Sequence, residues 1–338
     1  TGTGSARSIT NDANAGDFQP DWIWATSRSN GYNNGMFDSS RGVQKELTSN
    51  TTNAEATLTT GVSSFDSDGF SFSGSAYNTS AYTFVAWQWK ANGGTTSSNT
   101  DGDVTSTVQV NSTSKFSIFT YTGNGNNLDT VGHGLGTTPD FCVIKGRSSG
   151  ASGTQRWFVK VPAVCGASEI LELDTTNAKG DSGNGIETMS STTVTLGIDT
   201  GNANGVNESG LNYVGYAFAS VEGYSKIGSY TGNGSTDGTF VYTGFRPAFV
   251  IYKRTDSTGS WLMYDNKRDS FNVVDLGLAP DLSNTEDVTT NDEHDFLSNG
   301  IKMRNTGGTP NASGGTYIYM AFAENPFVTS SGVPVVAR

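Results

Sequence analysis

Apolar residues in this chain come in short runs that are separated by turns rich in Gly, Ser, Thr and Asn. Some runs are continuous, as at 141–144 and 249–252, and others alternate, so that Tyr82, Phe84 and Ala86 share one face of an extended segment. No long stretch has the period of about 3.6 residues that marks an amphipathic helix. The pattern predicts short strands joined by tight turns, and hence an all-β fold.

One set of landmarks occurs three times. The segment Tyr-Thr-Gly-Asn-Gly at 121–125 recurs at 230–234, and the chain itself opens with Thr-Gly-Thr-Gly at 1–4. A proline followed by an apolar run comes after each start, at 20–24, 139–144 and 247–252. These runs read as central strands that are entered from a proline turn.

Two further landmarks complete each copy. An aromatic residue followed by Asp and Arg occupies 37–41 in the first copy and 264–268 in the third, whereas the second copy has Trp157 in this slot and lacks the Asp and the Arg. Each copy closes with a Tyr four residues before an Ala-aromatic pair. The closing pairs are Ala86-Trp87, Ala217-Phe218 and Ala321-Phe322.

A period of roughly 110 to 120 residues is too long for one turn of a solenoid and fits a self-contained domain. The sequence therefore predicts three tandem β-sandwich domains, jelly-roll or concanavalin-like, arranged as beads on a string. The predicted boundaries are 1–98 for the first repeat, 99–113 for a flexible linker, 114–222 for the second repeat and 223–338 for the third.

The first copy lacks the strand that precedes the start of the other two, at 115–121 and 226–230. Either the natural polypeptide is longer, or another chain supplies the strand; a longer polypeptide is the favoured interpretation. Ala337-Arg338 is interpreted as a natural C-terminus, so an anchoring part is expected ahead of Thr1.

Composition excludes several classes of function. The formal net charge is −12 and no stretch concentrates the basic residues, which disfavours nucleic acid as a partner. No apolar run is long enough for membrane insertion. Two cysteines, Cys142 and Cys165, are too few for a disulfide framework and are expected to be buried free thiols rather than a pair.

Candidate chemistry is sparse, and we expect no enzyme. The chain has two histidines: His133 lies in a glycine turn and is expected to be structural, and His294 is expected on a solvated acidic loop. Clustered Cys and His for zinc are absent, and no cofactor is expected. Structural calcium is the alternative, at the pairs Asp66/Asp68 and Asp101/Asp103, which are more simply solvated turn carboxylates.

A glycan-trimming hydrolase would need two positioned carboxylates. Glu172 and Asp174 share a strand face after Glu169, in a segment similar to the Glu-x-Asp-x-x-Glu signature of laminarinase-like hydrolases. Asn177 replaces the third acid, and the other two copies have no counterpart. The sequence therefore gives this activity little support.

The alignment of the three copies also indicates which tryptophans lie in a core and which lies at a surface or an interface. Trp22 and Trp24 align with apolar residues of the other copies, as does Trp87, so all three are expected in cores. Trp89 aligns with Ser220 and Glu324. We therefore expect Trp89 at a surface or an interface, with edge packing as the alternative, and it is the one ligand or interface candidate.

The landmarks resemble repeated β-rich domains in virion proteins of marine bacteriophages, including cyanophages. The likeness covers nearly the whole chain and rests on Thr-Gly-Asn-Gly after a Tyr, Val-Gly-His-Gly-Leu-Gly at 131–136, Phe-Asp-Ser-Asp-Gly-Phe at 65–70, and Ala-Phe-Ala-Glu-Asn-Pro-Phe-Val at 321–328.

The resemblance implies a tail fibre or adhesin on the virion surface, and thus an extracellular location. Implied partners are other virion proteins, further copies of the chain, with a trimer favoured, and a host glycan. A head decoration or outer fibre with a purely structural role is the alternative.

Overall fold

The computed structural model describes residues 1–11, 17–149, 155–181, 183–198, 205–288, 293–325, 327–328 and 334–335. Apart from the short helix α1 (Gly308–Asn311), the regular elements of this part are antiparallel β-strands, which confirms the predicted all-β fold. None of the helical residues described forms a span able to cross a membrane. Ala337 and Arg338, the predicted C-terminus, lie outside the described residues.

The first repeat is a sandwich of a larger sheet, in the order β5-β4-β3-β2-β8, and a smaller one, β1-β7-β6. Side chains of both sheets meet in one core that includes Ile23, Phe37 and Phe70. The strands are β1 (Arg7–Ile9), β2 (Trp22–Ser27), β3 (Gly35–Asp38), β4 (Lys45–Thr48), β5 (Ala56–Thr57), β6 (Val62–Asp66), β7 (Gly69–Phe72) and β8 (Phe84–Trp89).

The second repeat has the same plan with added edge strands: its larger sheet runs β16-β15-β14-β13-β19-β11-β10-β9 and its smaller sheet β12-β18-β17. The strands are β9 (Ser97–Asn99), β10 (Ser106–Asn111), β11 (Phe116–Thr122), β12 (Thr130–Gly132), β13 (Phe141–Gly146), β14 (Trp157–Lys160), β15 (Glu169–Glu172), β16 (Gly180–Asp181), β17 (Ile186–Met189), β18 (Thr193–Leu196) and β19 (Asn212–Phe218). Residues 99–113 are therefore not a flexible linker, because residue 99 and residues 106–111 pair into this sheet.

The third repeat combines β20-β28-β22-β23 with β21-β27-β26 and the pair β24-β25. A further pair, β29-β30, follows near the end of the chain. The strands are β20 (Ser225–Thr231), β21 (Phe240–Tyr242), β22 (Pro247–Arg254), β23 (Leu262–Asp265), β24 (Leu276–Gly277), β25 (Asp287–Val288), β26 (His294–Leu297), β27 (Gly300–Met303), β28 (Thr316–Ala323), β29 (Phe327–Val328) and β30 (Pro334–Val335).

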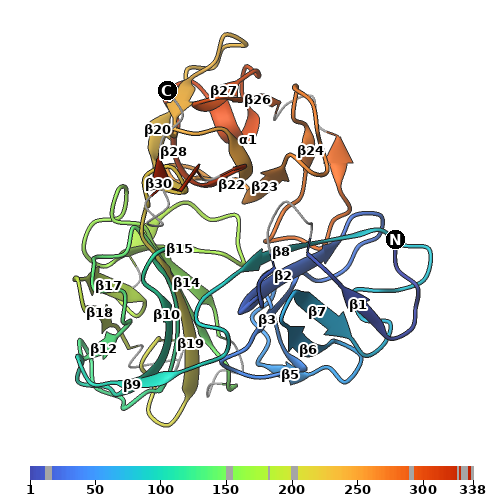
Figure 1. Cartoon of the computed structure of the whole chain (residues 1–338). Helices are drawn as coiled ribbons and strands as arrows, with labels where there is room; N and C mark the ends of the chain where they lie inside the picture. Colours follow the sequence, from blue (N-terminus) through green and yellow to red (C-terminus); the bar gives the residue numbers. More distant parts are fainter. Residues whose placement is uncertain are drawn as a thin grey trace.

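The three repeats surround a shared core instead of lying on a string (Figure 1). In β2, Ile23 and Ala25 point into the first repeat's own sandwich, whereas Trp22 and Trp24 point into a core that all three repeats share. Both faces of the central strands are thus buried, which explains why these segments read as continuous apolar runs. The predicted bead arrangement is wrong, because each sandwich uses its second face to join the others.

The Thr-Gly-x-Gly starts are held alike in every repeat, each by a buried Asn. The backbone N–H groups of Thr3, Asn124 and Asn233 donate to the Oδ1 atoms of these residues at 3.0, 3.1 and 3.0 Å. The accepting residues are Asn78, Asn207 and Asn311. The opening of the chain is therefore the structural counterpart of the two internal starts.

The closing strands follow a register that differs by two residues from the one the Ala-aromatic pairs suggest. Trp22 pairs with Trp89, Phe141 with Phe218, and Phe249 with Phe322. Trp89, not Trp87, is therefore the first repeat's counterpart of Phe218 and Phe322. Phe84 likewise takes the place of the closing tyrosines, Tyr213 and Tyr317.

Candidate functional site

Trp89 lies where the three repeats meet. Its ring centroid is 6.3 Å from that of Phe218 and 5.7 Å from that of Phe322, which are themselves 6.0 Å apart. The indole also lies 4.5 Å from Trp22, and the residue is only 6% exposed. Of the two expected places for Trp89, a surface or an interface, the surface is wrong, and the alignment behind that expectation was shifted by two residues. The interface at Trp89 lies between repeats of one chain.

A cycle of hydrogen bonds closes the ring of repeats. Trp157 of the second repeat donates from Nε1 to the carbonyl of Thr48 in the first, at 2.9 Å. Trp261 of the third repeat donates to the carbonyl of Glu172 in the second, also at 2.9 Å. Asn34 of the first repeat completes the cycle by donating to carbonyls of the third, that of Ala279 at 3.2 Å among them. Each repeat thus contacts both others.

A buried polar cluster joins the first repeat to the second. Arg41 pairs with Asp38, and the Tyr216 hydroxyl donates to Asp38 Oδ2 at 2.7 Å. Glu55 receives Arg41 at 3.1 Å and Arg147 at 2.9 Å. Burial alone would raise the pKa of Glu55, but the hydrogen bonds and charges of the two arginines outweigh it and lower the pKa. The cluster is charge-balanced and largely excluded from water.

An equivalent polar cluster, made of other residues, joins the third repeat to the first. Arg268 pairs with Asp265 at 2.6 Å, and Trp87 donates from Nε1 to Asp265 Oδ2 at 3.0 Å. Glu286 receives both Arg268 and Arg28 at 2.8 Å. Trp87 is therefore buried, as expected, and it has the role that Tyr216 has at the first interface.

The joint between the second and third repeats replaces this cluster with apolar residues. Val161 and Val164 stand where the other repeats have Asp and Arg, and Met320 stands where they have Tyr216 and Trp87. All three belong to, or pack against, the shared core. A backbone bond from Lys179 N–H to the Thr255 carbonyl at 2.9 Å matches its counterparts at the other two joints.

Two buried lysines lie near these joints at equivalent positions of β13 and β22. Lys145 Nζ donates to the carbonyls of Gln155 and, at 3.3 Å across the joint, Thr51. Lys253 Nζ donates to the carbonyls of Gly259 at 2.6 Å and, across the joint, Thr176 at 3.1 Å. Burial lowers the pKa of Lys145 to about 7 and that of Lys253 to about 8.

Neither histidine is placed for nucleophilic catalysis. His133 is fully buried, and its Nδ1 accepts the backbone N–H of Leu135 at 3.2 Å, as expected for a structural residue. His294 is also fully buried, with its ring centroid 4.6 Å from that of Tyr264, so the expected solvated loop is wrong at this residue. Cys142 and Cys165 are buried free thiols, as predicted.

The carboxylate candidates are engaged within the fold. Glu172 and Asp174 converge on Arg156, at 3.1 and 3.2 Å, which makes them parts of an ion-pair cluster. Among the described residues no group of three or more His, Cys, Asp or Glu side chains could hold a metal ion. Asp66 accepts the Ser71 hydroxyl at 2.7 Å, and Asp103 accepts that of Thr130 at 2.8 Å.

Exposed aromatic side chains occur only in the third repeat within the described part of the chain. Phe240, Tyr242 and Phe271 are 43%, 62% and 84% exposed. Phe240 and Tyr242 point to one face of the edge strand β21. Phe271 precedes Asn272, whose side chain bonds to Phe296 of β26 at the other edge of the same sheet.

The fold does not require these aromatics in β21. Register places Thr130 and Gly132 of the second repeat, and Ser8 and Thr10 of the first, at the positions of Phe240 and Tyr242. Comparison of the three copies in sequence could have found this difference, but it needs the correct pairing of short strands. We therefore take the exposed face of β21 and the loop at Phe271 as the candidate functional site.

The family assignment rests on nearly the whole chain. A family model described as a domain of unknown function, DUF7483, matches residues 1–326. The chain belongs to the DUF7483 family. The match spans all three repeats as one unit, in agreement with the shared core. The comparisons with curated proteins and with solved structures each gave no significant match.

Proposed function

We propose that this DUF7483 chain is a virion surface protein of a bacteriophage, of tail-fibre or adhesin type, that attaches to the host cell without catalysis. The observation that carries the proposal is the set of exposed aromatics in the third repeat. Phe240 and Tyr242 stand where the other repeats have small or polar residues, so packing does not account for them. Neighbouring exposed aromatics on one strand face form an apolar patch of the kind that is typical of binding sites, whereas a single exposed residue such as Leu128 is ordinary.

The ligand that suits this face is a host glycan. Aromatic rings on a flat strand face offer stacking surfaces for sugar rings, and the neighbouring Ser, Thr and Asn residues supply hydrogen-bonding groups. The low proportion of charged residues, 15%, argues for a neutral partner over a polyanion. The rigid ring of repeats would hold the face in a fixed orientation on the particle.

Two measurements test the proposal. Antibodies against the chain should label intact virions in electron micrographs, at the tail for a fibre or adhesin. The fluorescently labelled chain should bind host cells, and Tyr242→Ser with Phe271→Ser should reduce that binding at least about tenfold. Leu128→Ser is the matched control, because Leu128 is 56% exposed in the second repeat and should leave binding unchanged. Unlabelled virions, or equal binding by the double variant, would contradict the proposal.

A purely structural role in a head decoration is the second candidate. It is favoured by the closed arrangement of three similar repeats, which suits a threefold position on a particle. Antibody label on the head, together with wild-type host binding by the Tyr242 and Phe271 variant, would support it over the adhesin.

A further inference from the structure

The edge of strand β8 is open where the equivalent strands are covered. In the described part of the chain β8 pairs only with β2, whereas β19 also pairs with β11, and β28 with β20. Phe84 of β8 is half-buried, while its counterparts Tyr213 and Tyr317 are completely buried. An unpaired row of backbone N–H and C=O groups is a template for a further strand.

The two covering strands share one pattern. Ile118 of β11 lies opposite Tyr216, and Ile227 of β20 lies opposite Met320, the positions of Trp87 in β8. Three residues later Tyr121 stacks on Tyr213 with ring centroids 5.0 Å apart. Tyr230 stacks on Tyr317 at the same distance. Each strand thus carries Ile-x-x-Tyr immediately before its Thr-Gly turn.

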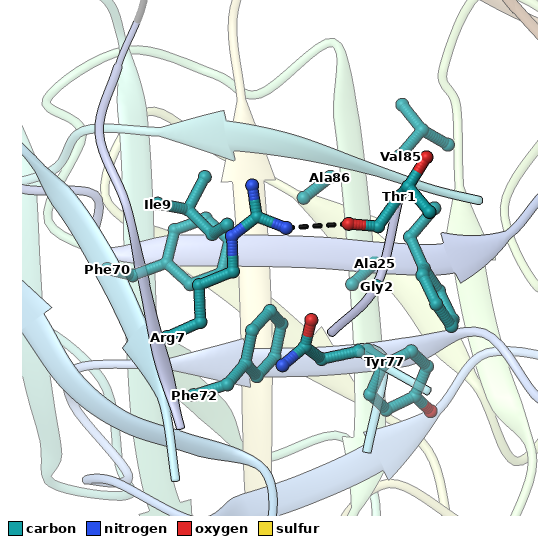
Figure 2. A pocket seen from close by; sticks show the side chains of 12 residues that line it. Thr1, Gly2, Arg7, Ile9, Ala25, Phe70, Phe72, Tyr77, Val85 and Ala86 are labelled. Carbon is teal, nitrogen blue, oxygen red and sulfur yellow. Dashed lines mark hydrogen bonds between the residues drawn. The ribbon is translucent and has the colours of Figure 1, made fainter. Parts of the chain in front are cut away.

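A cavity marks the place where the tyrosine of such a strand would lie in the first repeat. It has a volume of about 140 Å³ and is lined by Phe84, Tyr77, Phe70 and Phe72 among others (Figure 2). This is close to the size of an apolar cavity that holds a benzene ring, about 150 Å³. The hydroxyls of Tyr121 and Tyr230 donate to the carbonyls of Val206 and Pro310. Tyr77 stands at the equivalent position, six or seven residues ahead of the closing strand.

A larger groove, of about 650 Å³, lies along the other end of β8. Its lining includes Trp87, Gln88 and Trp89 of the first repeat and Phe249 and Phe322 of the third. The Gln88 Oε1 atom is buried and has no hydrogen-bond partner. This groove is where the isoleucine opposite Trp87 would pack, and a donor from the incoming strand would satisfy Gln88.

The direction of the strand is set by Thr1 and Gly2. The Gly2 N–H donates to the Tyr82 carbonyl at 2.7 Å, as Gly123 does to Leu211 and Gly232 to Gly315. In the covered repeats the residue before each of these glycines, Thr122 or Thr231, is the last residue of the covering strand. Thr1 has their place, so a strand that ends at Thr1 would run antiparallel to β8 in the established register.

We propose that the open edge of β8 accepts an extended strand of the pattern Ile-x-x-Tyr that is continuous with Thr1, in the place that β11 and β20 occupy in their repeats. The strand adds backbone hydrogen bonds along β8, fills the cavity with its tyrosine and covers Trp87 with its isoleucine. It bridges the first and third repeats, because both line the groove.

The test extends the full chain by six residues that copy 225–230 of β20, Ser-Lys-Ile-Gly-Ser-Tyr, placed directly before Thr1. The extension should raise the thermal midpoint by about 3 °C or more. Backbone amides of β8 should exchange with solvent at least about tenfold more slowly. The matched control is the same extension with its Ile and Tyr replaced by Ser, which should show neither effect.

A free peptide of the same six residues distinguishes a strand that is continuous with Thr1 from one that binds as a separate molecule. It should slow exchange of β8 amides in the chain that begins at Thr1 only at high concentration, and it should have no effect on the extended chain. Equal binding of the peptide to both chains would place it elsewhere and overturn the proposal. An extension that leaves the midpoint and the β8 amides unchanged, or a serine control that matches the Ile and Tyr version, would also overturn it.

Discussion

Replacement of Asp38 by Val tests whether the residues of a buried polar cluster stabilise the fold only when all of them are present. Asp38 accepts both the Arg41 guanidinium and the Tyr216 hydroxyl, and neither the Asp38 nor the Arg41 side chain is exposed to solvent. In Asp38→Val the Arg41 guanidinium keeps its ion pair with Glu55 at 3.1 Å and its hydrogen bond to the Met36 carbonyl at 2.9 Å, but it loses the adjacent carboxylate, and the Tyr216 hydroxyl loses its acceptor. Removal of one partner from a buried ion pair costs about 3 to 5 kcal/mol, because the other charge stays buried.

The second and third repeats show how the loss can be offset. Their joint carries Val161, Val164 and Met320 at the positions of Asp38, Arg41 and Tyr216. The triple variant Asp38→Val, Arg41→Val and Tyr216→Met reproduces this apolar set at the first joint. Replacing a buried ion pair by apolar residues of similar volume is often neutral or stabilising, so the triple variant should lie within about 2 kcal/mol of the wild type.

Urea unfolding followed by tryptophan fluorescence gives both free energies, with the dependence on urea checked for a constant slope. The triple variant should be more stable than the single one although it carries two more substitutions. A single variant that loses less than about 1 kcal/mol would refute the buried-charge argument. A triple variant less stable than the single one would refute the idea that the three positions form a set.

Two other perturbations test the shared core and a buried lysine beside a joint. Trp89→Ala should lower the free energy of unfolding by about 3 to 5 kcal/mol, as for a buried aromatic. Phe271→Ala, in an exposed loop, should change it by less than about 0.5 kcal/mol. Equal values for the two variants in urea unfolding would contradict this prediction. Lys145 has a pKa of about 7 in the folded chain, below its unfolded value of 10.5. Between these two pH values the unfolded chain binds more protons than the folded chain, so the free energy of unfolding should rise with pH from about 7 to 10. Lys145→Met should remove this part of the slope in a pH series of unfolding measurements, and an unchanged slope would refute the assignment.

The sequence predicted the strands and the repeat but not the joint between repeats. Tight turns at Gly and Pro and apolar runs are local signals, and they identified the all-β class and the three starts. The central run at 22–24 was correctly interpreted as core. Which core Trp22 enters is not a local property, because Ile23 and Trp22 point to opposite faces of one strand and both faces are apolar.

The misplacement of Trp89 shows how a landmark can be shifted. The first copy has a Tyr four residues before an Ala-aromatic pair, as the other copies do, but the structural counterpart of Tyr213 is Phe84. Two residues of slip keep every side chain on the same face of the strand, so alternation gave no warning. Only the pairing partners of the strand distinguish the two registers, and those lie far away in the sequence.

The joint between the first and third repeats differs from the other two in its connection. The first and second repeats, and the second and third, are neighbours along the chain, whereas the first and third meet without a direct peptide connection. This joint holds Trp87 on Asp265 and Arg28 on Glu286, and it also contains the groove beside β8. A strand bound at β8 would cover Trp87 and contact the third repeat. Its free energy of binding would therefore stabilise the joint between the first and third repeats, which no direct peptide connection holds together. Binding of a strand at the β8 edge and stability of the ring of repeats are therefore expected to be coupled.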